Sequence, residues 1–330
     1  MKYYTIAYGC ALLLSLLAGY ISLPVLKKLH AAQTINELGP QTHFEKQGML
    51  TMGGVGVLLS GVTAGLAFGF YKTNDHGQLV LFLVLCTLCF AAIGFLDDYL
   101  KVVKRRSVGL SVWQKMLPQI LAAAVFAVIA YADKNIGSRI AIPFTDKTLN
   151  LGIFYIPIMA FVIVAVDNSA NILDGLDGLL STNGSISLFA MSLYTIWKGT
   201  QTANGSLINA GIFLLCMSAA VFGFLKYNAH PAKVILGDVG SLGIGGALAG
   251  AAIVSRGMLL IPFCCITMLI SSLSDILQLY YMKKHAGRKL MRMSPLHHHL
   301  ELGGMSETQI VSLYSIITLL GSAAALFLFT

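Results

Sequence analysis

Ten long apolar segments, separated by short polar loops, constrain this sequence more than any other feature. A helix needs about 20 apolar residues to cross the hydrocarbon core of a bilayer. Only 11% of the residues are charged, against about 25% in soluble domains. We therefore expect an all-α, polytopic integral membrane protein that forms one domain over residues 1–330. The predicted spans lie at about residues 3–26, 51–71, 78–96, 116–132, 151–166, 178–197, 206–225, 241–255, 257–282 and 308–329.

The span at 241–255 is short and rich in glycine, and joining it to the next span across Arg256 would give nine helices instead of ten. Lysine and arginine predict the orientation, because these residues are enriched in cytoplasmic loops. Alternate loops hold 15 of the 22 basic residues. We therefore expect these loops in the cytoplasm and both termini outside. The net charge of +8 then reflects topology and attraction for anionic lipids and substrates, and no nucleic-acid partner is expected.

Six of the fourteen acidic residues fall where predicted helices reach the cytoplasmic side: Asp97, Asp98, Asp167, Asp174, Asp177 and Asp238. Charged groups at the edge of a bilayer are costly and are usually functional. Clustered carboxylates repel one another unless a cation neutralises them, and oxygen-rich sites suit Mg²⁺ that holds phosphates. The pattern indicates a membrane enzyme that acts on a phosphorylated substrate.

Two acidic loops differ in how strongly they indicate function. Asp97 and Asp98 are followed by a basic run and could form an ordinary solvated helix end; alternatively, one carboxylate binds a cation and the other acts as a base. The segment VDNSANILDGLDGL has three acidic residues and no lysine. In a helix, Asp167, Asn171 and Asp174 would share one face, while the glycines that follow allow a turn presenting Asp177. A functional site is the better explanation of this loop.

The last two cytoplasmic loops add a candidate metal ligand and three histidines. KYNAHPAKVILGDVGSLG couples Asn228, His230 and Lys233 to Asp238 at the start of a span, a plausible platform for Mg²⁺ and phosphate. PLHHHLE contains the consecutive His297, His298 and His299, which cannot all face one metal on a regular element. Contacts with phosphate or sugar hydroxyls are therefore favoured over zinc.

Taken in order, GFLDDYLKVVK, NILDGLDGL, NAHPAKVILGDVGSLG and PLHHHLE closely resemble motifs of the phospho-N-acetylmuramoyl-pentapeptide transferase family. This family is a branch of the bacterial polyprenyl-phosphate N-acetylhexosamine 1-phosphate transferases. The resemblance covers essentially the whole chain, and GPQTHFEKQGMLTMGG is similar to the first cytoplasmic loop of the family. It implies transfer of phospho-MurNAc-pentapeptide from UDP-MurNAc-pentapeptide to undecaprenyl phosphate, with release of UMP and formation of lipid I in the bacterial plasma membrane. A homodimer is compatible with it.

The resemblance also implies roles for individual residues. Asp238 corresponds to the Mg²⁺ ligand, Asp97 and Asp98 to the pair beside the phosphates, and the three histidines to further catalytic residues. Gln278 is expected near the nucleoside, and Gly175, Leu176 and Asp177 in the uracil pocket. Contacts with the diphosphate and sugar are expected from Lys46, Thr51, Lys101, Lys115, Asn168, Asn171, Asp174 and Asn228.

Some positions depart from the family pattern, and three alternatives stay open. Ile235 stands where a phenylalanine often stacks on uracil, and an aliphatic side chain cannot stack in that way. The lipid phosphate could attack directly or through an aspartyl-phosphate on Asp97 or Asp98. A transferase of N-acetylglucosamine 1-phosphate is the nearest alternative. A cation-coupled transporter is the rival from another class, although only Asp275 lies clearly inside a predicted span.

Overall fold

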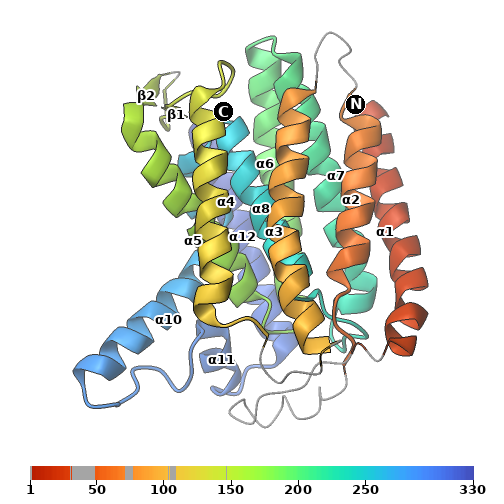
Figure 1. Ribbon diagram of the computed structural model, residues 1–330, viewed down its shortest axis with the longest axis vertical. Helices are drawn as coiled ribbons and strands as arrows, with labels where there is room; N and C mark the ends of the chain where they lie inside the picture. Colours follow the sequence, from red (N-terminus) through yellow and green to blue (C-terminus); the bar gives the residue numbers. More distant parts are fainter. Residues whose placement is uncertain are drawn as a thin grey trace.

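A bundle of long helices makes up the fold of the computed structural model (Figure 1). The structure describes residues 2–29, 31, 49–70, 77–102, 104, 109–145 and 147–330, so Lys46 lies outside the described residues. In chain order the elements are α1 (Lys2–Lys28), α2 (Gly54–Phe68), α3 (Gln78–Val102), α4 (Val112–Ala132), β1 (Arg139–Ala141), β2 (Thr148–Asn150), η2 (Gly152–Phe154), α5 (Tyr155–Leu173), α6 (Leu179–Gln201), α7 (Gly205–Asn228), α8 (Gly237–Val254), η3 (Met258–Leu260), α9 (Ile261–Cys264), α10 (Ile266–Lys284), α11 (Leu296–Glu301) and α12 (Glu307–Phe329).

The expected all-α membrane fold is confirmed. Every predicted span contains a helix, and among the described residues seven helices are long and apolar enough to cross a membrane, or eight if the bent pair α9–α10 is counted as one span. The helix α2 has only 15 residues, so the total of ten spans stays a prediction. Arg256, with a φ of 54°, separates α8 from η3, which supports treating the two spans as distinct.

The predicted continuous helix over 257–282 is wrong. The chain turns by 82° between α9 and α10, at Cys265, whose backbone is not helical. The break leaves the Cys264 carbonyl outside the helical ladder, and the Ser187 hydroxyl of α6 donates a hydrogen bond to it at 2.6 Å. Broken helices persist in membranes where such a neighbour satisfies the freed backbone group. As a result α10 leans away from the bundle (Figure 1).

Helix α8 lies inside the bundle and is almost completely buried. It packs against α2, α3 and α5. Glycine permits these approaches: a Cβ atom on Gly94 of α3 would overlap the backbone of Asp238, and one on Gly54 of α2 would overlap that of Gly240. Small residues let helix backbones touch in this way. These contacts fix the first turn of α8, which carries Asp238, against the end of α3.

The two ends of the bundle differ. The start of α1, the end of α12 and the small β1–β2 hairpin lie at one end, and α11 lies at the other (Figure 1). The N–H group of Phe144, in the loop of the hairpin, donates to the Leu328 carbonyl of α12 at 2.7 Å. This arrangement agrees with both termini lying on one side of the membrane, and the cytoplasmic assignment of the α11 end stays a prediction.

Candidate functional site

The site is assembled where the start of α8 meets the segment that precedes α2. Leu50 and Val234 form a parallel bridge, which brings Thr51 beside Gly237. Gly237 has a φ of 73°, a conformation that favours glycine. A Cβ atom there would also lie 2.6 Å from the Asp98 Oδ2 atom and 2.8 Å from the Thr51 Oγ1 atom. Glycine at this position therefore allows Thr51 and Asp98 to approach the first turn of α8.

Three of the six predicted aspartates gather here. Carboxylate oxygens of Asp97, Asp98 and Asp238 lie within 4.8 Å of one another. Both oxygens of Asp98 accept hydrogen bonds from α8, one from the N–H of Asp238 at 3.1 Å and one from the N–H of Val239 at 2.9 Å. The Asp97 Oδ1 atom accepts a hydrogen bond from the N–H of Leu110 at 2.6 Å. The two adjacent acids thus have different partners, as their separation around a helix requires.

Two lysines and an asparagine surround Asp238. The Nζ atoms of Lys101 and Lys115 each lie 3.0 Å from the Asp238 Oδ2 atom, and Lys101 also pairs with Asp97 at 2.5 Å. The Asn171 amide donates to the Asp238 Oδ1 atom at 2.8 Å and accepts from Lys115 at 2.9 Å. When all are ionised, the three carboxylates exceed the two ammonium groups by one negative charge, so the cluster can take a further cation and also offers donors to phosphate oxygens.

The histidine segment lies against the loop between α5 and α6. A Cβ atom on Gly175 would lie 2.5 Å from the His297 Nε2 atom and 3.2 Å from the His298 Nε2 atom. His298 pairs with Glu301 at 2.9 Å, and the His299 Nδ1 atom accepts a hydrogen bond from the N–H of Arg292 at 3.0 Å. The structure therefore places His297 and His298 against the loop that carries Asp174, Gly175, Leu176 and Asp177.

The predicted coupling of His230 to Asp238 is wrong. His230 instead lies 3.3 Å from Asp177 and 3.9 Å from Glu307, and these three residues form a second group of potential metal ligands. Asp177 is buried, its Oδ2 atom accepts the N–H of Ala232 at 2.9 Å, and its own N–H donates to Glu307 at 3.0 Å. Sequence reasoning missed Glu307, whose only signal was its place in the first turn of the last helix.

The single helical face predicted for Asp167, Asn171 and Asp174 forms only in part. Helix α5 ends at Leu173, so Asp174 lies beyond it, and Asp167 is fully buried with its Oδ2 atom accepting from Gln119 at 2.9 Å. The Asn168 amide donates to the same Gln119 side chain at 3.2 Å and to the Val164 carbonyl. Of the polar residues on this helix, Asn171 is the one that reaches Asp238.

Two residues that were predicted to contact the substrate, Asn228 and Gln278, form hydrogen bonds with backbone groups in this structure. The Asn228 side chain is buried, accepts from the Ser181 hydroxyl at 2.6 Å and donates to the Val234 carbonyl at 3.1 Å. The Gln278 amide donates to the Met291 carbonyl at 3.1 Å and accepts from the N–H groups of Leu290 and Met291 at 3.0 Å. Both residues therefore shape loops around the site, and their contact with a substrate stays a prediction.

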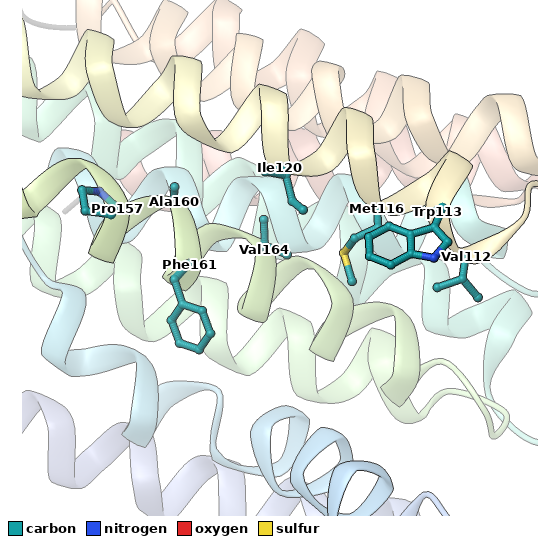
Figure 2. A pocket seen from close by; sticks show the side chains of 8 residues that line it. All are labelled: Val112, Trp113, Met116, Ile120, Pro157, Ala160, Phe161 and Val164. Carbon is teal, nitrogen blue, oxygen red and sulfur yellow. The ribbon is translucent and has the colours of Figure 1, made fainter. Parts of the chain in front are cut away.

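An apolar groove of about 600 Å³ runs between α4 and α5 (Figure 2). Its mouth adjoins the polar cluster, because Met116, one of its lining residues, follows Lys115 and contacts the Asn168 amide. Trp113 and Phe161 are among the exposed large side chains that line it. The eight lining residues are Val112, Trp113, Met116, Ile120, Pro157, Ala160, Phe161 and Val164. The geometry thus places a charged cluster beside an apolar groove.

Comparison with known proteins identifies the family. The glycosyl transferase family 4 model matches residues 80–256, which include Asp97, Asp98 and Asp238. The chain is 39% identical to a phospho-N-acetylmuramoyl-pentapeptide-transferase of Clostridium botulinum (strain Alaska E43 / Type E3), over 93% of this chain and 90% of the relative. It is 39% identical to the Bacillus subtilis (strain 168) protein of the same name, over 93% and 91%. For the Thermoanaerobacter sp. (strain X514) protein of that name the identity is 37%, over 94% and 93%. The chain therefore belongs to glycosyl transferase family 4, in the group of the phospho-N-acetylmuramoyl-pentapeptide-transferases.

Proposed function

We propose that this protein transfers phospho-MurNAc-pentapeptide from UDP-MurNAc-pentapeptide to undecaprenyl phosphate, giving lipid I and UMP in the first membrane step of peptidoglycan synthesis. The proposal places the reaction at the cytoplasmic face of the bacterial plasma membrane and treats residues 1–330 as one transferase domain. Relatives with this printed name share 36–39% of their residues with the chain. A homodimer stays a prediction.

One observation carries the proposal: the Asp97, Asp98 and Asp238 cluster, with its two lysines, adjoins the mouth of an apolar groove. Transfer of a phosphosugar to a lipid phosphate requires a polar site for two phosphorylated groups beside a path for a long hydrocarbon chain. The cluster and the groove meet both requirements within one part of the molecule.

Mg²⁺ fits the donor set that the cluster offers. Mg²⁺ prefers oxygen ligands and usually keeps several waters, with one or two carboxylates and substrate phosphates. We assign Asp238 as the metal ligand, since 17% of its side chain is exposed against 3% for Asp97. Asp98 is less suited, because both of its oxygens accept backbone hydrogen bonds. Bound at Asp238, Mg²⁺ would supply charge neutralisation and alignment of the diphosphate.

The protein groups then have distinct tasks in the transfer. Lys101 and Lys115, each 3.0 Å from Asp238, can turn to the phosphate oxygens and neutralise their charge. An oxygen of the lipid phosphate attacks the phosphorus that carries the sugar, the bond from this phosphorus to the UMP oxygen breaks, and UMP leaves with the electron pair. Asp97 takes up any proton that remains on the attacking phosphate, since its Oδ2 atom contacts the Lys101 side chain, whereas its Oδ1 atom accepts the backbone N–H of Leu110.

The remaining residues surround the reacting groups in this proposal. The loop of Gly175, Leu176 and Asp177 borders the uracil, and His297, His298 and His299 face the sugar and diphosphate from α11. Thr51 and Asn171 lie next to the cluster. Lys46, Asn168, Asp174, Asn228 and Gln278 complete the proposed contacts.

The groove between α4 and α5 would hold the first isoprene units of the acceptor. Its lining is entirely apolar, and burial of hydrocarbon from water favours occupancy by a chain whose phosphate lies at the cluster.

A transfer assay with purified protein in lipid nanodiscs tests the proposal. With undecaprenyl phosphate present, UDP-MurNAc-pentapeptide should yield UMP and lipid I, and UDP-GlcNAc should yield no lipid product. A preference for UDP-GlcNAc would assign the protein to the related N-acetylglucosamine 1-phosphate transferases. Coupled cation flux without transfer would support a transporter.

A further inference from the structure

His298 forms a buried pair with Glu301 on α11. Its Nδ1 atom lies 2.9 Å from the Glu301 Oε2 atom, and 9% and 8% of the two side chains are exposed. An ionised carboxylate can only accept hydrogen bonds. The proton of this bond must therefore be on the Nδ1 atom of His298, which leaves the Nε2 atom with a lone pair or with a second proton.

In His299 the Nδ1 atom accepts a hydrogen bond, whereas in His298 it donates one. The His299 Nδ1 atom accepts this hydrogen bond at 3.0 Å from the backbone N–H of Arg292, which can only donate. The Nδ1 atom of His299 thus carries no proton, and its Nε2 atom carries the single proton of a neutral ring. The Arg292 guanidinium donates to the Leu302 carbonyl at 2.5 Å, which holds the Arg292 segment to the far end of α11.

The Nε2 side of the His298 ring has a defined direction. A Cβ atom on Gly175 would lie 3.2 Å from the His298 Nε2 atom, so this atom faces the loop between α5 and α6. The Nδ1 atom faces Glu301, so the Nε2 side of the ring is the side that borders this loop.

We propose that Glu301 and the Arg292 amide fix His298 and His299 in opposite tautomers, and that Glu301 is a positioning residue for His298. This inference rests on the proposed function and deepens it. His298 accepts a hydrogen bond from a sugar hydroxyl, or after taking up a proton donates to a phosphate oxygen. His299 serves only as a neutral donor. The consecutive histidines are therefore not interchangeable.

Nitrogen NMR of the full chain, labelled with ¹⁵N-histidine and held in nanodiscs, tests the assignment without turnover. His298→Gln and His299→Gln assign the signals. We expect a protonated Nδ1 atom for His298 and a protonated Nε2 atom with a bare Nδ1 atom for His299. In Glu301→Gln the amide oxygen still accepts, so the His298 signals should keep their pattern, whereas Glu301→Leu should alter them. The same tautomer in both histidines, or unchanged His298 signals in Glu301→Leu, would overturn the proposal.

Transfer kinetics distinguish positioning from simple support of α11. Loss of a group that orients a functional side chain typically costs about tenfold or more in rate. Glu301→Leu should lower kcat by about that factor, and Glu301→Gln should restore most of it. Because Glu301 acts through His298, Glu301→Leu should add no further loss in a His298→Gln background. Additive losses would contradict the positioning role. The predicted tautomers in a protein that makes no lipid I would instead contradict the proposed function and leave the tautomer assignment intact.

Discussion

Asp98 caps the helix that carries Asp238. Its two carboxylate oxygens accept the N–H groups of Asp238 and Val239 at 3.1 and 2.9 Å, in the first turn of α8. The backbone donors at a helix N-terminus have no partners within the helix, and a negative charge there is favourable. Asp98 therefore fixes the position of Asp238, while the neighbouring Asp97 has one oxygen on Leu110 and the other on Lys101.

Asparagine substitutions should separate the two adjacent acids. Asp98→Asn retains only one acceptor for two backbone donors, which should cost about 1–3 kcal/mol and lower the temperature of thermal unfolding as well as kcat. Asp97→Asn keeps an oxygen for the Leu110 amide but loses the charge beside Lys101. It should lower kcat with little effect on unfolding. Differential scanning fluorimetry and steady-state transfer kinetics provide the measurements, and equal thermal stability of the two variants would contradict the capping role.

Asp238→Asn should abolish transfer while leaving a folded protein, because the change removes charge with little change in shape. Mn²⁺ can substitute for Mg²⁺, and its binding can be followed by electron paramagnetic resonance. The variant should bind one Mn²⁺ ion fewer than the unmodified protein. Asp133→Asn is the matched control, since Asp133 follows α4 and caps the amides of Asn135 and Ile136. Normal turnover or unchanged Mn²⁺ binding in Asp238→Asn would refute the metal assignment.

Gly94→Ala should disturb the site without changing any charged group. The added methyl group would overlap the Asp238 carbonyl and force α3 away from α8. Overpacking of this kind typically costs about 1–3 kcal/mol. Gly9→Ala is the control, because a Cβ atom there meets nothing within 4 Å. We expect lower thermal stability and reduced kcat only in Gly94→Ala, and equal behaviour of the two variants would show that the α3–α8 contact does not position Asp238.

Apolar run length predicted the helices well, because a bilayer demands about 20 apolar residues from any spanning helix. The motifs likewise indicated Asp97, Asp98, Asp238 and Lys101, and the family resemblance indicated Lys115; the structure brings these five residues together. Pattern alone did not predict the break at Cys265, since the carbonyl freed there is satisfied by Ser187, a residue 77 positions away in sequence.

The sequence also failed to predict the partners of polar side chains that depend on how the helices pack. Helical spacing placed Asp167 and Asn171 one turn apart, as they are in α5, but it did not predict that Gln119 of α4 donates a hydrogen bond to the Asp167 carboxylate. No local signal specifies which helix lies alongside. In the same way, His230 is close to Asp238 in sequence yet pairs with Asp177 and Glu307. Polar side chains near a site are distributed among partners by the tertiary arrangement, so a motif indicates the residues of a site more reliably than their contacts.

Cysteine labelling should establish the orientation. In a background without the six native cysteines, Lys289→Cys and Lys147→Cys place thiols at exposed positions of the loop after α10 and of the β1–β2 hairpin. The charge distribution predicts that an impermeant thiol reagent added to intact cells labels only the Lys147→Cys protein. Labelling of both variants after the cells are opened is the accessibility control. The reverse pattern in intact cells would place the cluster on the wrong side for a cytosolic nucleotide.

Filling the groove between α4 and α5 should weaken use of the lipid substrate specifically. Ala160 lines the groove in the second turn of α5, at the end away from Met116 and the charged cluster, and Ala160→Trp would occupy much of the space (Figure 2). Loss of about 1.4 kcal/mol of binding free energy corresponds to a tenfold change in affinity. We therefore expect the KM for undecaprenyl phosphate to rise by about tenfold, with the KM for UDP-MurNAc-pentapeptide nearly unchanged. Leu320→Trp on the exposed face of α12 is the matched control for adding a large ring at a lipid-facing position. Equal effects of the two tryptophans, or an effect of Ala160→Trp on the nucleotide substrate alone, would place the acceptor chain elsewhere on the bundle.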